Sequence, residues 1–321
     1  MTDATVTFDL IRDLSELTRH DLPLAGGKAA ALGDMMRAGI PVPSGFVLLS
    51  PAFDDLVAQA GLSAALASYS KAIVSQDTAA ATALSAEIHD ALLGADLPSQ
   101  LSTAIVSHMR ALGAPLVAVR SSAVSEDGAR ATWAGQMDSF LNTDEQTLLE
   151  NVRKCWASLF GTRANFYRLH MDAQGPSTAA AVIVQQMVPS EVSGVAFSTH
   201  PITGDESIVL IEAGFGLGEA VVSGRITPDS YTVVKQTQEI VAKDVAYQDC
   251  LMQRAPAGGN EWRDLDRGRG EMQKLDDGLI RELVELVLAV EQHWGHPVDV
   301  EWALCKGQFY IVQSRAITGM E

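Results

Sequence analysis

The sequence contains few cysteines, and they are scattered. Its 321 residues include only Cys155, Cys250 and Cys305, which show no paired metal-binding spacing. We interpret all three as free thiols with a packing role, in a reducing compartment such as the cytoplasm. The sequence has neither a CxxC motif nor a G-x-S-x-G elbow, which argues against thiol redox enzymes and serine hydrolases.

Positive charge and uncharged apolar stretches are also scarce. Lysine and arginine number 23 against 40 acidic residues, for a formal charge of −17, which disfavours nucleic acids and anionic membranes as partners. A phosphate-bearing ligand would therefore need a local basic site. The most apolar long segment, from Leu279, is interrupted by Arg281, Glu282, Glu285 and Glu291, so it does not read as a membrane span. The first residues do not resemble a signal peptide, and we expect a soluble cytoplasmic protein.

The length predicts two lobes, because 321 residues exceed the usual size of one hydrophobic core. The apolar run Ala179–Val188 reads as a strand that ends at Pro189, and we place the boundary there, between lobes 1–188 and 189–321. Helical patterns dominate the first lobe and strand patterns the second, which indicates an α+β fold. Residues 239–272 read as polar and irregular. A cleft between lobes is a common ligand site.

Two segments carry basic residues that could bind phosphate. Gly26-Gly27-Lys28 precedes a helical pattern and places Lys28 at a helix start. The buried strand Pro115–Val119 runs directly into Arg120. Each residue could equally be an ordinary surface or ion-paired cation. The glycine pair is not a Walker A loop, because Ala29 follows the lysine where Ser or Thr is needed.

The last two predicted strands carry a second group of polar residues. Asp299 and Glu301 alternate with apolar residues and share one face, and Gln313 and Arg315 share a face in the same way. Carboxylate and amide oxygens suit Mg²⁺, and a guanidinium can hold a phosphate through two hydrogen bonds. The pattern therefore predicts a magnesium-phosphate site. The alternative is an exposed amphipathic hairpin with a solvated polar face.

The length of the connecting loop decides whether these four side chains meet. A two-residue turn at 306–307 would put Gln313 on the face opposite to Glu301. A three-residue loop at 306–308 would instead set Glu301 opposite Gln313, and the other carboxylate opposite the arginine. We predict the three-residue loop, because it gathers a carboxylate, an amide and a guanidinium on one surface.

Six ordered blocks of this sequence match one family. They are GGKAAALGDM, VPSGFVL, VAVRSSAVSEDGARATWAGQMDSFLN, VQQMVPSEVSGVAFSTHPITGD, GFGLGEAVVSGRITPDSY and VDVEWALCKGQFYIVQSRAIT. Along nearly its whole length the chain resembles the N-terminal ATP-grasp domain of phosphoenolpyruvate synthase, pyruvate phosphate dikinase and rifampicin phosphotransferase. The resemblance implies a two-lobed ATP-grasp fold. Two departures are Ala316, where the family usually has proline, and His296–Asp299, which replaces a Pro-Gln-Asp run.

The resemblance also implies a role for each matching residue. For binding the phosphates and for catalysis it indicates Lys28, Arg120 and Arg315. For the loop over the phosphates it indicates Thr132, Gly135 and Gln136. For the hinge that receives adenine through backbone groups it indicates Gln185, Gln186, Met187 and Val188. For the ribose it indicates Glu219. For Mg²⁺ it indicates Glu301 and Gln313.

The reaction implied by the resemblance is a pyruvate, water dikinase-like phosphotransfer. Mg-ATP would donate its β-phosphate to a histidine, giving AMP and phosphate. None of the seven histidines of this sequence lies in a glycine-rich Ser-His motif, so we expect the histidine on a separate domain or subunit, with a further domain for the acceptor. The alternatives are a phosphotransferase with rifampicin or a phenol as acceptor, or a stand-alone ATP-binding regulatory protein.

Overall fold

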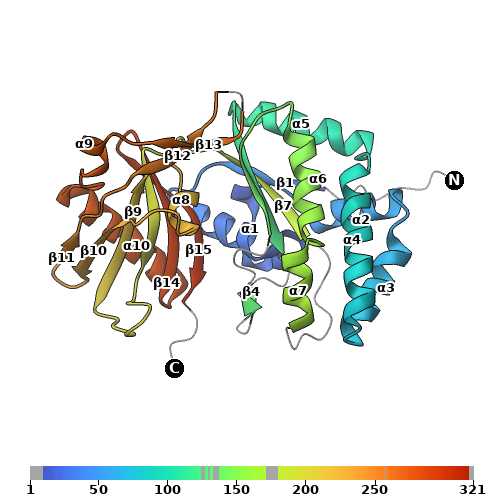
Figure 1. The fold of residues 1–321 in the computed structure, drawn as a ribbon, viewed down its shortest axis with the longest axis horizontal. Coiled ribbons are helices and arrows are strands. Elements are labelled where there is room, and N and C mark those ends of the chain that lie inside the picture. Colours follow the sequence, from blue (N-terminus) through green and yellow to red (C-terminus); the bar gives the residue numbers. More distant parts are fainter. Residues whose placement is uncertain are drawn as a thin grey trace. The chain divides into compact units, whose positions relative to one another are not determined.

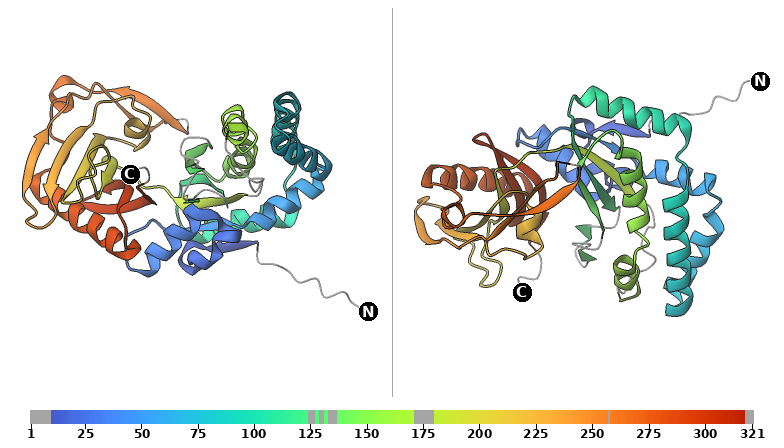
Figure 2. Two further views of the ribbon diagram at one scale, coloured as in Figure 1. Left: turned by 90° about the horizontal axis from the view of Figure 1, so that it is seen from below. Right: turned by 45° about the horizontal axis from the view of Figure 1, so that its top comes forward.

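The computed structural model describes residues 10–123, 127–128, 131–132, 137–170, 180–256 and 258–317. The chain divides into two compact units (Figures 1 and 2). The first unit comprises residues 1–33 and 44–186, and the second comprises residues 34–43 and 187–321. Both contain antiparallel sheets with helices, so the fold is a mixed α/β structure.

The first unit is built on a five-stranded antiparallel sheet. Its strand order is β1-β2-β7-β3-β6, so strands far apart in the sequence are neighbours. The strands are β1 (Ile11–Asp13), β2 (Gly45–Leu48), β3 (Val117–Ala123), β6 (Ser139–Thr143) and β7 (Ala180–Gln186), and a separate pair is formed by β4 (Asp127–Gly128) and β5 (Ala131–Thr132). The central strand β7 is buried along Ala180–Gln185, which explains its continuous apolar sequence.

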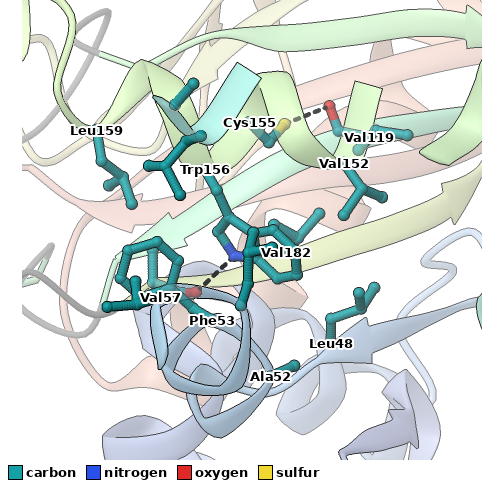
Figure 3. Packing of buried hydrophobic residues seen from close by; sticks show 14 of the residues in the cluster. Leu48, Ala52, Phe53, Val57, Val119, Val152, Cys155, Trp156, Leu159 and Val182 are labelled. Atoms are coloured by element: carbon teal, nitrogen blue, oxygen red, sulfur yellow. Dashed lines mark hydrogen bonds between the residues drawn. The ribbon is translucent and has the colours of Figure 1, made fainter. Parts of the chain in front are cut away.

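Helices pack against this sheet and against one another. They are α1 (Leu22–Arg37), which belongs to this unit only as far as Gly33, α2 (Ser50–Gln59), α3 (Ser63–Val74), α4 (Thr78–Gly94), α5 (Ser99–Leu112), α6 (Leu148–Ser158) and α7 (Thr162–His170), with short 3-10 turns at Leu14–Glu16 and Arg19–Asp21. Figure 1 shows α4 beside α6 and α7. Trp156 of α6 lies at the centre of the core, where its Nε1 donates to the Ala180 carbonyl at 3.0 Å and its ring contacts Phe53 of α2 (Figure 3).

The second unit contains a six-stranded antiparallel sheet with the order β11-β10-β9-β8-β14-β15. Its strands are β8 (Val192–Phe197), β9 (Ile208–Phe215), β10 (Asp229–Val234), β11 (Ile240–Asp244), β14 (Val298–Cys305) and β15 (Gln308–Ala316). The helix α10 (Asp277–Trp294) covers one face of this sheet (Figure 2). Its buried stripe follows the helical period and consists of Ile280, Leu283, Val284, Val287 and Val290.

The segment 239–272, which the sequence analysis read as irregular, is more regular in the structure. Besides β11 it contains the hairpin β12 (Cys250–Arg254) and β13 (Asn260–Asp264), followed by the short helix α9 (Arg267–Gly270). The expectation was wrong because β11 and β13 are mostly exposed on both faces. Such strands lack the alternation of apolar and polar residues on which the reading depended.

A buried ion pair links β10 to the segment before α10. The Nζ of Lys274 lies 2.8 Å from Oδ1 of Asp229, and both side chains are fully buried. The carboxylate of Asp229 also accepts from the Tyr231 hydroxyl at 2.6 Å, from the Ala246 backbone N–H at 3.0 Å and from the Lys274 backbone N–H at 2.9 Å. These bonds compensate for the desolvation of the buried charge.

The cysteines and the helices can be compared with the expectations from the sequence. All three cysteines are free thiols, as predicted, and two of them, Cys155 and Cys250, are buried. Within the described part of the chain, the helices are too short or too polar to cross a membrane.

Candidate functional site

The hairpin β14–β15 closes with a two-residue turn, and the predicted three-residue loop is wrong. Cys305 pairs with Gln308, which leaves Lys306 and Gly307 in the turn. Both turn residues have positive φ angles, 51° and 75°. Positive φ at both central positions is typical of the type I′ turn, whose twist suits a two-residue hairpin.

The predicted pairing is nevertheless present, because β15 contains a bulge. Trp302 pairs with Ile311, whereas the preceding residue of β14, Glu301, pairs with Gln313. Val312 is therefore the extra residue of a β-bulge. The one-residue offset that the sequence analysis assigned to the loop lies within the strand, and it brings Glu301 and Gln313 opposite each other as predicted.

Two pairs from this hairpin lie on the same face of the sheet. Asp299 pairs with Arg315, and the Arg315 Nε and Nη2 atoms lie 2.7 and 2.6 Å from Asp299 Oδ2. Asp299 is buried, and Glu301, Gln313 and Arg315 are half-buried. Burial raises the pKa of Asp299, and Glu301 raises it further, while Arg315 opposes the shift. The face is therefore not the fully solvated surface of the alternative reading.

A third carboxylate, which the sequence analysis missed, extends this row across the sheet. Glu301 pairs with Val195 of β8, and Val195 pairs with Glu212 of β9, so all three side chains project from one face. Burial raises the pKa of Glu212, and the negative charge of Asp299 adds to the shift. The signal in the sequence was a single acidic residue within the apolar strand IVLIEAGF.

The donor set of this hairpin fits Mg²⁺. Glu301 offers a carboxylate and Gln313 an amide oxygen from directly opposed positions. Mg²⁺ is usually held by one or two protein oxygens, and phosphates and waters complete its shell. Among the described residues no group of three or more His, Cys, Asp or Glu side chains could hold a metal ion. A site at Glu301 and Gln313 would therefore use one carboxylate and one amide.

In the first unit, β3 and α1 bring Lys28 and Arg120 to one region. The helix α1 is interrupted at Gly26 (φ 74°, ψ 165°) and resumes just before Lys28. A side chain at Gly26 would lie 2.3 Å from the Ser122 carbonyl, so only glycine permits this approach. The Ala29 N–H then donates to the Ser122 hydroxyl at 3.1 Å, which fixes the start of the helix two residues along β3 from Arg120.

The buried thiol of Cys155 lies within the electrostatic influence of these two cations. Burial raises the pKa of this thiol and Asp138 adds to the shift, while Lys28 and Arg120 both act in the opposite direction. The thiol donates to the Val119 carbonyl at 3.5 Å (Figure 3). Both basic side chains thus favour the thiolate, but burial has the larger effect on the thiol.

The predicted phosphate loop is only partly described. Thr132 belongs to β5, where it pairs with Asp127 of β4. Gly135 and Gln136 lie outside the described residues. The role of all three residues in covering phosphates stays a prediction.

The predicted adenine hinge spans the boundary between the units, which falls between Gln186 and Met187. Gln185 is buried in β7, and Gln186 is exposed with its N–H donated to the Ser44 carbonyl at 2.7 Å. Met187 and Val188 follow the strand and are half-buried. The structure thus places the four residues consecutively at the end of β7.

Glu219, the predicted ribose residue, is exposed at the start of the short helix α8 (Glu219–Val222). A tightly held loop, Gly216–Gly218, connects β9 to this helix. Gly216 has a φ of 91°, and a side chain there would lie 2.5 Å from the Met252 carbonyl. The same carbonyl accepts from the Leu217 N–H at 2.9 Å. Glycine is therefore required where the loop passes the β12–β13 hairpin.

Comparison with known proteins identifies the family. Residues 22–321 match the pyruvate phosphate dikinase AMP/ATP-binding domain, so the chain belongs to this family of nucleotide-binding domains. The resemblance drawn from the six sequence blocks is confirmed.

The relatives are longer proteins. The probable phosphoenolpyruvate synthase of Methanocaldococcus jannaschii is 38% identical over 96% of this chain and 26% of its own length. The phosphoenolpyruvate synthase of Aeropyrum pernix is 36% identical over 92% of this chain and 40% of its own length. The rifampicin phosphotransferase of Bacillus subtilis is 35% identical over 96% of this chain and 36% of its own length. The chain thus spans well under half the length of these relatives.

Among solved structures, the D-alanine-D-alanine ligase of Helicobacter pylori aligns with 64% of this chain and 43% of its own, with 10% identity and a TM-score of 0.28. A likeness this weak carries no argument about the fold.

Proposed function

We propose that this chain is the Mg-ATP-binding part of a dikinase-type phosphotransferase similar to phosphoenolpyruvate synthase, with an ATP-grasp fold. The observation that carries the proposal is the hairpin β14–β15 within an AMP/ATP-binding family. It sets Glu301 opposite Gln313 and, on the same face, Asp299 opposite Arg315. Oxygen donors beside an oriented guanidinium are the groups that a metal-bound polyphosphate requires.

In this proposal Glu301 and Gln313 hold Mg²⁺, which when bound would neutralise charge on the ATP phosphates. Arg315 binds a phosphate while Asp299 fixes the plane of its guanidinium. Lys28 supplies further positive charge to the phosphates, together with Arg120. These residues position the phosphates and offset their charge, which are the main protein contributions to phosphoryl transfer.

The remaining contacts to the nucleotide follow from the family resemblance. The backbone of residues 185–188 receives adenine, and Glu219 binds the ribose. Thr132, Gly135 and Gln136 cover the phosphates. The three free thiols are consistent with a reducing compartment, and we place the chain in the cytoplasm.

The full reaction requires a phosphate acceptor. We propose that the β-phosphate passes to a histidine on a separate domain or subunit, with AMP and phosphate as the products. A pyruvate, water dikinase-like activity is one outcome for the complete enzyme. A rifampicin-like or phenolic acceptor is the second candidate, because a rifampicin phosphotransferase is 35% identical to this chain. A stand-alone ATP-binding regulatory protein would keep the same nucleotide contacts.

The test is calorimetric titration of the purified chain with ATP, with and without Mg²⁺, followed by an assay for AMP. We expect Mg-dependent binding and no AMP from the chain alone. Absence of ATP binding would overturn the proposal. Release of AMP and phosphate by the chain alone would overturn the need for a separate histidine.

A further inference from the structure

The side chain of Gln248 binds the backbone at the end of β9. It is 1% exposed, and its Oε1 accepts from the Phe215 N–H at 2.8 Å. Its Nε2 donates to the Phe215 carbonyl at 3.0 Å and to the Cys250 carbonyl at 2.9 Å. One carboxamide thus satisfies both backbone groups of Phe215.

The Gln248 side chain continues the hydrogen bonding of β9 beyond the point where its neighbour β10 ends. The strand β10 pairs with β9 only as far as Asp229 opposite Ala213, two residues before Phe215. The Gln248 carboxamide offers one acceptor and one donor to Phe215, as a neighbouring strand would. The backbone of Gln248 is itself anchored, because its N–H donates to the Gly270 carbonyl at 3.0 Å.

Phe215 is the residue from which the glycine-rich loop departs. The carbonyl of the next residue, Gly216, accepts from the hydroxyls of Ser190 and Ser193 at 3.0 and 2.6 Å. The loop then turns into α8, whose first residue is the exposed Glu219. The position of the Glu219 carboxylate therefore depends on a loop that starts directly after Phe215, the strand residue that Gln248 holds.

We propose that Gln248 is a positioning residue for ribose recognition, acting through Glu219; this inference rests on the proposed function. An ionised carboxylate only accepts hydrogen bonds, and the two ribose hydroxyls donate them. The contact favours a nucleotide with ribose hydroxyls only if the carboxylate is already held in place. A mobile side chain would lose conformational entropy on binding, and this loss would offset the gain from the hydrogen bonds. Gln248 restrains the loop through its hydrogen bonds to Phe215 and does not itself contact the nucleotide.

The experiment compares ATP with 2′,3′-dideoxy-ATP, each with Mg²⁺, by calorimetric titration. Wild-type protein should prefer ATP roughly tenfold, the value of one hydrogen bond to a charged group. Gln248→Ala should reduce this preference to within about twofold, as should Glu219→Ala, and the double variant should show no further loss. Affinity for inorganic triphosphate should be unchanged in every variant.

Gln253→Ala is the matched control. Gln253 lies on β12 and bonds the Glu261 side chain at 3.0 Å, so its loss leaves the Phe215 contacts in place. It should keep the full preference for ATP. If Gln248→Ala does not fold, Gln248→Met carries the test: it keeps the length and fills the space without hydrogen-bonding groups or a buried charge, and it should also lose the preference.

The outcomes separate the inference from the proposed function. A Gln248 variant that keeps the wild-type preference overturns the inference, as does one that weakens both nucleotides equally, since that is a purely structural effect. Wild-type protein that binds ATP without preference over the dideoxy compound also overturns it, while the ATP-binding function stands. Wild-type protein that binds neither nucleotide overturns the proposed function itself.

Discussion

Arg315 holds the carboxylate of Asp299 through two nitrogens, with Nε and Nη2 at 2.7 and 2.6 Å from the same oxygen. The side chain of Asp299 is 9% exposed and that of Arg315 is 39% exposed, so the pair reaches from the sheet interior to its surface. Burial raises the pKa of Asp299 even with the guanidinium beside it. An ionised Asp299 carboxylate in this buried position adds little to the stability of the fold. It is better suited to orienting the Arg315 side chain.

Replacing Asp299 with asparagine should therefore separate stability from binding. The folded-state pKa of Asp299 lies above its ordinary value of 3.8, so the fold disfavours the ionised form. Wild-type stability relative to Asp299→Asn should fall as the pH rises from 3.8 through the raised pKa, and the difference should be constant below that range. At neutral pH we expect the variant to be at least as stable and to bind Mg-ATP on the order of tenfold more weakly. Urea unfolding across pH, with titration of ATP, measures both; a stability difference that does not vary with pH would contradict the assignment.

Removing either predicted metal ligand should affect binding of ATP only when Mg²⁺ is present. Glu301→Ala and Gln313→Ala should each lower Mg-dependent ATP affinity by about 10–100-fold. Mutating a group that only hydrogen-bonds to a metal ligand already costs this much, and loss of the ligand itself should cost at least as much. The double variant should lose less than the sum, because the two residues act on one ion. Glu282→Ala, an exposed position on α10, is the control and should bind as wild type. Equal losses with and without Mg²⁺ would argue against a metal role.

Breaking the buried pair of Asp229 and Lys274 should strongly destabilise the second unit. Lys274→Met leaves the Asp229 carboxylate buried without its ammonium partner and should cost about 3–5 kcal/mol. The matched control is Lys243→Met, because Lys243 pairs with Asp277 where the two side chains are 34% and 49% exposed. That change should cost much less, because solvent screens an exposed ion pair. Urea unfolding compares the two variants, and similar losses would show that burial of the pair is not the cause.

The thiols should differ in reactivity. Cys155 is fully buried and burial raises its pKa, so little thiolate forms and reagents cannot reach it. Cys305 is only half-buried. Iodoacetamide applied to the native protein should label Cys305 first and Cys155 only after unfolding in urea, as peptide mass mapping would show. Labelling of Cys155 as fast as Cys305 would contradict the burial of this thiol.

The hairpin shows how far the sequence could predict the site. Period-two alternation placed Asp299 and Glu301 on one face, and the pairing of Glu301 with Gln313 followed from a one-residue offset. The sequence could not show where that offset lies, since a longer turn and a bulge at Val312 give the same pairing near the site. Lys-Gly is also a weaker signal for a type I′ turn than Asn-Gly.

Residues that act across long separations were beyond the sequence analysis. Gln248 binds Phe215 from 33 positions further along the chain, in a segment without a clear period. Glu212 joins the row of Glu301 only because β9, β8 and β14 are neighbours in the sheet. Such contacts depend on strand order, which periodicity along one strand does not encode.

The two units are interleaved along the chain. Residues 34–43 belong to the second unit although they precede most of the first. Within the second unit, the Pro41 carbonyl accepts from the Ile311 N–H at 2.8 Å, and Asp34 lies 3.2 Å from His293. A single genetic crossover after residue 186 would therefore combine the β14–β15 edge of one parent with the segment 34–43 of another. Such a recombinant should keep a stable second unit only when the segment 34–43 of one parent packs well against the second unit of the other.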